Sequence, residues 1–152
     1  MTSLNRTHPN FWAHLFSVMD GAGLFEGCTF KAMILDDTTT ADTEWDSQTT
    51  VADFSTLGEL SSGSRIAITG LTYPIPGAST QAFLNFTAPV WSALAAGTNP
   101  PQHVLFYVEL AGWASDVDSI PVALVDAVFT PDGTDFTCTI PINGLLGSES
   151  AP

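Results

Sequence analysis

The most constraining feature of the sequence is a nearly unbroken apolar run, His103-Val-Leu-Phe-Tyr-Val-Glu-Leu110. Pro100 and Pro101 precede this run, and Gly112 follows it. A short run between such breakers, rich in β-branched and aromatic residues, is typical of a strand that is buried on both faces rather than of a helix. The rest of the chain must therefore supply strands that pair with this one and layers that cover it.

Five other segments have the composition or the period of two that strands require. We expect strands at residues 29–36, 65–69, 81–87, 120–129 and 135–140. In residues 29–36 the even-numbered side chains would share one face and the odd-numbered ones the other. Pro121 would mark the start or an edge of its strand, because proline has no N–H to donate to a ladder. The pattern predicts a mainly β fold, either an antiparallel β-sandwich or a partly open barrel.

Helical periodicity is confined to short stretches. Residues 10–19 place Phe11, Trp12, Leu15 and Phe16 on one face, so we expect one short N-terminal α-helix that packs this face on the sheet. Residues 51–60 show the same spacing over one or two turns. Residues 88–94 read as an irregular crossing that places Trp91 and Leu94 in the core.

The organisation expected is one β-rich domain at residues 10–141, with an N-terminal arm at 1–9 and a C-terminal tail at 142–152. Both ends lack periodicity but contain the apolar residues Leu4, Leu145 and Leu146. A solvated tail gains nothing by exposing leucine, whereas a tail that orders on a neighbour buries it. We therefore expect at least one terminus to dock on another chain, with the three leucines as interface residues.

The charge balance excludes several classes of partner. The 152-residue chain has 3 Lys and Arg against 16 Asp and Glu, a formal net charge of −13. Nucleic acids and anionic lipid surfaces are both recognised through Lys and Arg, so neither direct nucleic-acid binding nor membrane binding is expected. The N-terminus has no signal-peptide pattern, and we expect synthesis in the cytoplasm.

No catalytic or metal motif is evident, and we expect no enzymatic activity, metal or cofactor. The acidic segment 36–46 could hold Ca²⁺, but it lacks the glycine and terminal glutamate of an EF-hand loop, and a solvated acidic loop is favoured. His103 is interpreted as a strand-end residue, since the sequence has no Gly-x-Ser-x-Gly elbow. Cys28 and Cys138 are expected to be reduced and semi-buried, with a disulfide between them as the alternative.

Two tryptophans, Trp45 and Trp113, lie in predicted loops. They could stack on a sugar or on a protein partner. Loop anchoring or burial in a protein interface is the simpler interpretation, because the apolar ring and its N–H suit both settings.

In residue composition and in the order of their expected elements, residues 11–141 resemble small virion structural proteins of tailed bacteriophages. The features that carry the resemblance are the aromatic helix followed by the strand at 30–37, the acidic Thr-rich loop, the segment 53–60, the crossing at 90–94, the strands at 104–107 and 121–126, and the hairpin at 130–137. The resemblance implies a non-enzymatic structural subunit, either a capsid decoration protein, a minor capsid protein or a tail-associated protein.

Our leading hypothesis is a decoration (cement) protein on the outer surface of a tailed-phage capsid, located in the virion, with the major capsid protein and further copies of itself as partners. An acidic protein suits the outer surface, because the inner surface faces packaged DNA. The alternative is a tail-associated or receptor-binding module that contacts the host surface through Trp45 and Trp113. A secreted carbohydrate-active enzyme would need a signal peptide and a catalytic dyad, and neither is recognisable in the sequence.

Overall fold

The computed structural model describes residues 6–7, 28–36, 38, 48–70, 86–95, 99–109, 112 and 115–139. Its elements, in chain order, are β1 (Arg6–Thr7), β2 (Thr29–Asp36), α3 (Val51–Gly58), β3 (Ile66–Ala67), β4 (Val90–Trp91), β5 (Pro101–Glu109), β6 (Ile120–Asp126) and β7 (Phe136–Thr137). All strand pairs among these elements are antiparallel. The described part is therefore mainly antiparallel β with one short helix, as the sequence predicts at this coarse level. The helix expected at 10–19 and most of the strand expected at 81–87 lie outside the described residues.

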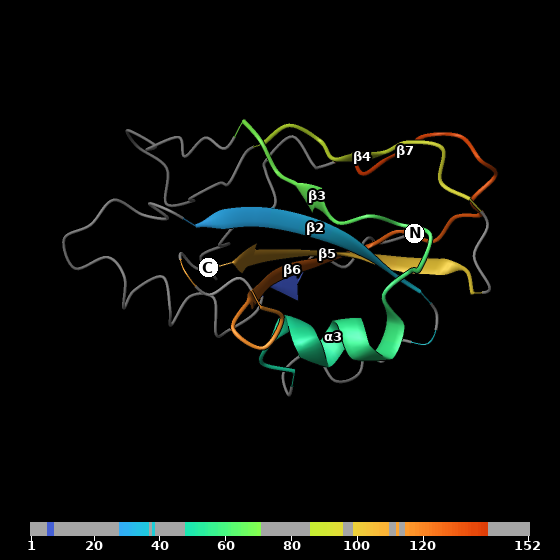
Figure 1. Ribbon diagram of the computed structural model, residues 1–152. Helices are drawn as coiled ribbons and strands as arrows, with labels where there is room; N and C mark the ends of the chain where they lie inside the picture. The colour runs from blue at the N-terminus through green and yellow to red at the C-terminus, as the bar shows by residue number, and fades with distance from the viewer. Residues whose placement is uncertain are drawn as a thin grey trace, which may run out of the picture.

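The main sheet has five strands in the order β1-β6-β5-β2-β3 and is open, with β1 and β3 at its edges (Figure 1). The central strand β5 is the apolar run, and it begins two residues before the predicted start at His103. Ala32 pairs with Phe106, and Phe106 in turn pairs with Ala123. The central position explains the composition of the run, because such a strand has no face or edge left for water.

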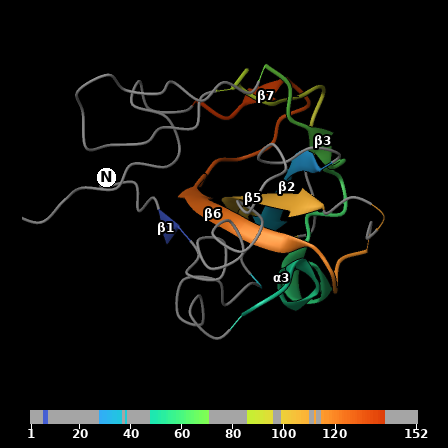
Figure 2. The same cartoon turned by 90° about the vertical axis from the view of Figure 1, so that its left-hand side faces the viewer.

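Alternation of side chains divides the core into two parts. One cluster contains the even-numbered residues of β2 and β5 together with Trp91, Leu94 and Cys138. The other contains Met33, Leu35, Leu105 and Tyr107 with residues of α3. Figure 2 shows the corresponding layers, with β7 on one side of the main sheet and α3 on the other. The expected burial of the central strand on both faces is thus confirmed.

The helix α3 confirms the one or two helical turns expected in this region. It covers the face of the main sheet that carries the odd-numbered side chains of β2 and β5. Val51 and Phe54 are fully buried against the sheet. The free N–H groups of its first turn find acceptors, since Val51 N donates to Ser119 O at 3.1 Å and Ala52 N to Asp116 O at 3.0 Å. These bonds fix the helix start to the turn between β5 and β6. No helix in the described residues is long and apolar enough to cross a membrane.

The second sheet consists of β4 and β7 and covers the even-numbered face. Trp91 and Leu94 are each 2% exposed, which confirms that the crossing at 88–94 places them in the core. Trp91 Nε1 donates to Ser64 O at 2.6 Å, so the ring also satisfies its polar atom. The layer is extended by Phe129, whose ring stacks on that of Phe136 with centroids 3.9 Å apart.

Several predicted strands are shorter in the structure. The strand expected at 65–69 is only β3, because regular pairing with β2 covers two residues, although Ile68 N still donates to Phe30 O at 2.8 Å. The strand expected at 135–140 is only β7. Beyond it Cys138 N still donates to Pro89 O at 3.1 Å, but Pro89 has no N–H to return a bond and continue the ladder. Phe86 and Thr87 belong to no strand, although Thr87 N donates to Thr69 O.

The strand expected at 120–129 ends at Asp126, where the chain leaves the main sheet and carries Phe129 to the second layer. Pro121 is the second residue of β6 and pairs with Tyr107, next to a register shift between Phe106 and Tyr107. An irregular ladder tolerates a residue without an N–H. The expectation that proline marks the start of this strand is confirmed.

Candidate functional site

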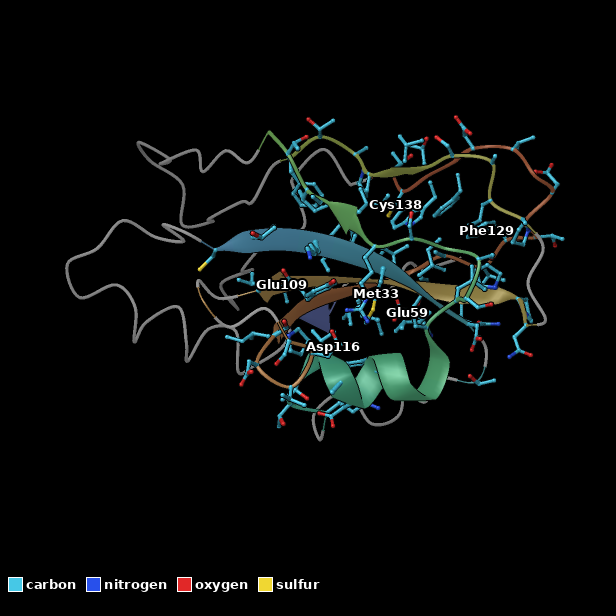
Figure 3. All side chains as sticks on the ribbon, viewed as in Figure 1. Met33, Glu59, Glu109, Asp116, Phe129 and Cys138 are labelled. Atoms are coloured by element: carbon cyan, nitrogen blue, oxygen red, sulfur yellow. The ribbon has the colours of Figure 1, made fainter. Side chains whose placement is uncertain are left out.

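The densest polar cluster in the described residues is centred on Arg65, just before β3. Its Nε and Nη2 donate to the two carboxylate oxygens of Glu59, at 2.8 and 2.6 Å. Its Nη1 and Nη2 donate to the two oxygens of Asp116, the latter at 2.8 Å. Glu59 follows α3 and Asp116 lies in the β5–β6 turn, and both are labelled on the α3 side of the sheet in Figure 3. We call Arg65, Glu59, Asp116 and the neighbouring Tyr107 the Arg65 cluster.

Tyr107 supports the guanidinium of Arg65 from the core. The guanidinium carbon lies 5.8 Å from the centroid of the Tyr107 ring, within cation–π range. Burial raises the pKa of Tyr107 to about 12, and the positive charge of Arg65 offsets part of this effect. Hydrogen bonds to Glu59, and then to Asp116, raise the pKa of Arg65 further above its usual range. Arg65 therefore stays charged and Tyr107 neutral at every physiological pH.

A second ion pair adjoins the Arg65 cluster. Lys31 Nζ lies 2.7 Å from Glu109 Oε1, and Lys31 is the register partner of Tyr107. Together the two groups contain three carboxylates and two cations, a local charge of −1. Both lysine or arginine side chains that the structure describes are thus neutralised by carboxylates of the same chain. The cluster joins α3, the β5–β6 turn and the sheet, and it offers no surplus positive charge to a phosphate or other anion.

At the other end of β5, His103 faces Asp126 across the β5–β6 ladder, with 3.3 Å between Nδ1 and Oδ1. The His103 side chain is 7% exposed and pairs on its other side with Leu35. This position near the strand start fits the interpretation of His103 as a strand-end residue.

Asp36 is the one carboxylate of the acidic segment 36–46 that the structure describes. It is buried, and its carboxylate accepts hydrogen bonds from Thr38 N at 2.9 Å, from Thr38 Oγ1, and from Asn99 Nδ2 at 3.3 Å. Among the residues described, no group of three His, Cys, Asp or Glu is placed to hold a metal ion. Asp36 therefore serves the local turn, and the rest of the segment lies outside the described residues.

Both cysteines are free, as expected, but only Cys28 is semi-buried, and Cys138 is buried. Cys138 is 4% exposed within the apolar cluster that contains Trp91, and burial raises the pKa of its thiol to about 11. Cys28 is half-buried and packs against the same cluster. A buried neutral thiol is a poor nucleophile, so the chemistry of Cys138 is that of a small apolar side chain.

Exposed apolar side chains occur singly in the described residues. Val90 on β4 is 43% exposed, Val117 in the β5–β6 turn is 63% exposed, and Val128 after β6 is 66% exposed. Single exposed valines are ordinary on a protein surface and do not by themselves define an interface.

The five residues proposed from the sequence as interface residues, Leu4, Trp45, Trp113, Leu145 and Leu146, all lie outside the described part of the chain. Their assignment stays a prediction. Sequence reasoning missed the Arg65 cluster, although the sequence contains one useful signal. An arginine that is one of three basic residues among 16 acidic ones is almost certain to have carboxylate neighbours. Which carboxylates these are depends on the tertiary fold.

No family model, curated protein or solved structure matches the chain. A functional proposal must therefore be built on the fold, the charge and the contacts described above.

Proposed function

We propose that this chain is a non-enzymatic virion structural protein, a decoration subunit bound to the outer surface of a tailed-phage capsid. The observation that carries the proposal is the state of its charges. The chain has a net charge of −13, and the basic side chains of Lys31 and Arg65 are occupied by Glu109, Glu59 and Asp116. A surface of this kind repels polyanions. Its position in a particle is then the face turned away from packaged DNA.

The polar contacts of the described residues support a structural role. The Arg65 cluster fixes α3 and the β5–β6 turn to the sheet, and Asp36 fixes a turn through Thr38 and Asn99. The charged side chains of both groups are bound by partners within the described part of the chain. A rigid, internally satisfied domain is what a subunit needs when its purpose is to present one fixed surface to neighbours.

We also propose that the two layers belong to a β-sandwich, with the main sheet as one layer and β4–β7 as part of the other. The apolar cluster between them, which includes Phe106, Trp91 and Cys138, supports this arrangement. An experimental structure in which further strands extend β4 or β7 would agree with a sandwich. A main sheet that closes on itself would instead make the fold a barrel.

The test of function is the location of the chain in purified particles of the virus that encodes it. Ser62 lies in an exposed turn after α3, so a Ser62→Cys variant in a Cys28→Ser background provides an accessible labelling site. We expect particles that lack the chain to bind the gold-labelled variant on the outer face of the head, as seen by cryo-electron microscopy.

The unlabelled Cys28→Ser chain is the matched control, because it should compete for the same positions without adding gold density. Labelled density confined to the tail would contradict the proposal and support the tail-associated or receptor-binding alternative. The absence of the chain from native particles by mass spectrometry would contradict both.

A further inference from the structure

The N-terminal strand β1 is attached to the sheet only at its edge. Arg6 pairs with Leu124 and Thr7 with Ala123, both on β6. The opposite side of β6 pairs with β5 through six register positions, from His103 to Val108. Figure 2 shows β1 beside β6, at the edge of the sheet remote from β3. Removal of β1 therefore leaves the pairing of the core strands unchanged.

The chain between β1 and β2 is much longer than the closed arrangement requires. Strands β1 and β2 are separated by β6 and β5, a distance of about 14 Å at the usual strand spacing. The connection comprises residues 8–28, which can span on the order of 70 Å when extended. A connection of this many residues does not by its length restrict β1 to its own sheet.

An exchanged β1 would make the same contacts with β6 as the closed one, because the register is set by β6 and not by the tether. Exchange of an identical element is thus a low-cost route to assembly, favoured when copies are concentrated.

We propose that β1 is an exchangeable strand, and that β6 of one copy accepts Arg6–Thr7 of a second copy of the same chain when the protein is assembled. This inference rests on the proposed function in one respect, because a capsid shell would hold many copies of the chain at high local concentration. It specifies the expected docking of the N-terminal arm, naming the acceptor strand and the register.

Disulfide trapping between copies tests the exchange. Directly opposed residues on antiparallel strands have Cβ atoms close enough for a disulfide after a small adjustment. In a Cys28→Ser background, Thr7→Cys is placed in one copy and Ala123→Cys in another, and the two are mixed at about 1 mM, a concentration comparable to the effective concentration of covalently linked binding elements. We expect a cross-linked heterodimer under glutathione redox conditions, and its yield should fall on dilution.

The matched control replaces Ala123→Cys with Thr137→Cys, an exposed position on β7 that β1 does not contact. The double variant Thr7→Cys/Ala123→Cys in one chain verifies the register by closing internally when dilute. Internal closure without cross-linking between copies at any concentration would overturn the exchange. Failure of both reactions would also overturn it, because β1 would then not occupy β6.

A second measurement uses the unmodified chain, since Ala123 is buried and its substitution can impair folding. In a sample that mixes ¹³C-labelled and unlabelled protein at the same concentration, isotope-filtered NMR should show a contact between Thr7 and Ala123 of different copies. A contact only within one molecule would contradict the inference. The cross-linking and NMR results do not depend on where the protein is located in a particle. The location, and with it the proposed function, is tested separately by microscopy of the labelled particles.

Discussion

Replacement of Arg65 by alanine should destabilise the domain more than any other single charge removal in the described residues. The guanidinium makes four hydrogen bonds to two carboxylates, and its side chain is only 26% exposed. In its absence Glu59 and Asp116 face each other without a cation between them. The cluster then changes from a net charge of −1 to −2 and loses its side-chain link between α3, the β5–β6 turn and β3, so that the backbone bonds of Val51 and Ala52 remain to connect α3 to the turn.

The magnitude follows from three contributions. A net hydrogen bond to a charged group contributes about 1.5–3 kcal/mol when it is well shielded, whereas an exposed ion pair contributes about 0–1 kcal/mol. Arg65 is intermediate between these limits. Repulsion between two carboxylates a few ångströms apart adds roughly 1 kcal/mol even in water. We therefore expect Arg65→Ala to lower the free energy of unfolding by about 2–3 kcal/mol.

Urea denaturation followed by circular dichroism measures this change, and Lys31→Ala is the matched control. Lys31 has a similar exposure, 29%, but makes a single contact with Glu109, so its removal should cost about 0.5–1 kcal/mol. Arg65→Lys should recover only part of the loss, because an ammonium group cannot bind two carboxylates in the planar fork geometry. An Arg65→Ala loss no larger than that of Lys31→Ala would refute the reasoning.

Three further outcomes follow from the pKa shifts. Hydrogen bonding to Thr50 N lowers the pKa of Asp53 below 3.8, so its stabilisation is present above that pH and is lost as the pH falls through the folded-state pKa. Asp53→Asn should therefore cost about 1 kcal/mol at pH 7, and this cost, measured by urea midpoints, should shrink as the pH is lowered below 3.8. Tyr107 has a folded-state pKa of about 12 against 10 when unfolded, so the free energy of unfolding should fall between pH 10 and 12. A Tyr107→Phe variant that loses the same amount of stability over this pH range would contradict this explanation. With iodoacetamide at pH 8, Cys138 should react far more slowly than Cys28 in peptide mapping, and equal rates would argue against its burial.

The central strand and the two faces of its neighbour could be predicted because they depend on local pattern. An apolar run between prolines and a glycine has few solutions other than a buried strand, and β5 is that strand. The alternation in residues 29–36 places Met33 and Leu35 on one face, and the structure confirms this division. The burial of Trp91 and Leu94 was predicted from their size and apolar character, and each is 2% exposed.

Strand ends and the polar cluster could not be predicted, because they are set by partners remote in sequence. Strand β7 ends where β4 begins after Pro89, a limit that residues 135–140 do not encode. Arg65 lies 6 residues from Glu59 and 51 from Asp116, and nothing in the local sequence distinguishes these two carboxylates from the other acidic residues. Strand β1 was missed for the same reason, since its two residues acquire extended pairing only from the β6 edge.

The layering also determines where a partner can bind. Strand β5 is covered by α3 on one face and by the β4–β7 layer on the other, and its edges are occupied by β2 and β6. Because the Arg65 cluster satisfies its own charges, the α3 side offers a partner little electrostatic gain to offset the cost of removing water. The main sheet is more accessible at its two edge strands, β1 and β3. The exchange proposed above places the contact between copies at the β6 edge, where backbone hydrogen bonds would provide affinity and the net charge of the chain matters least.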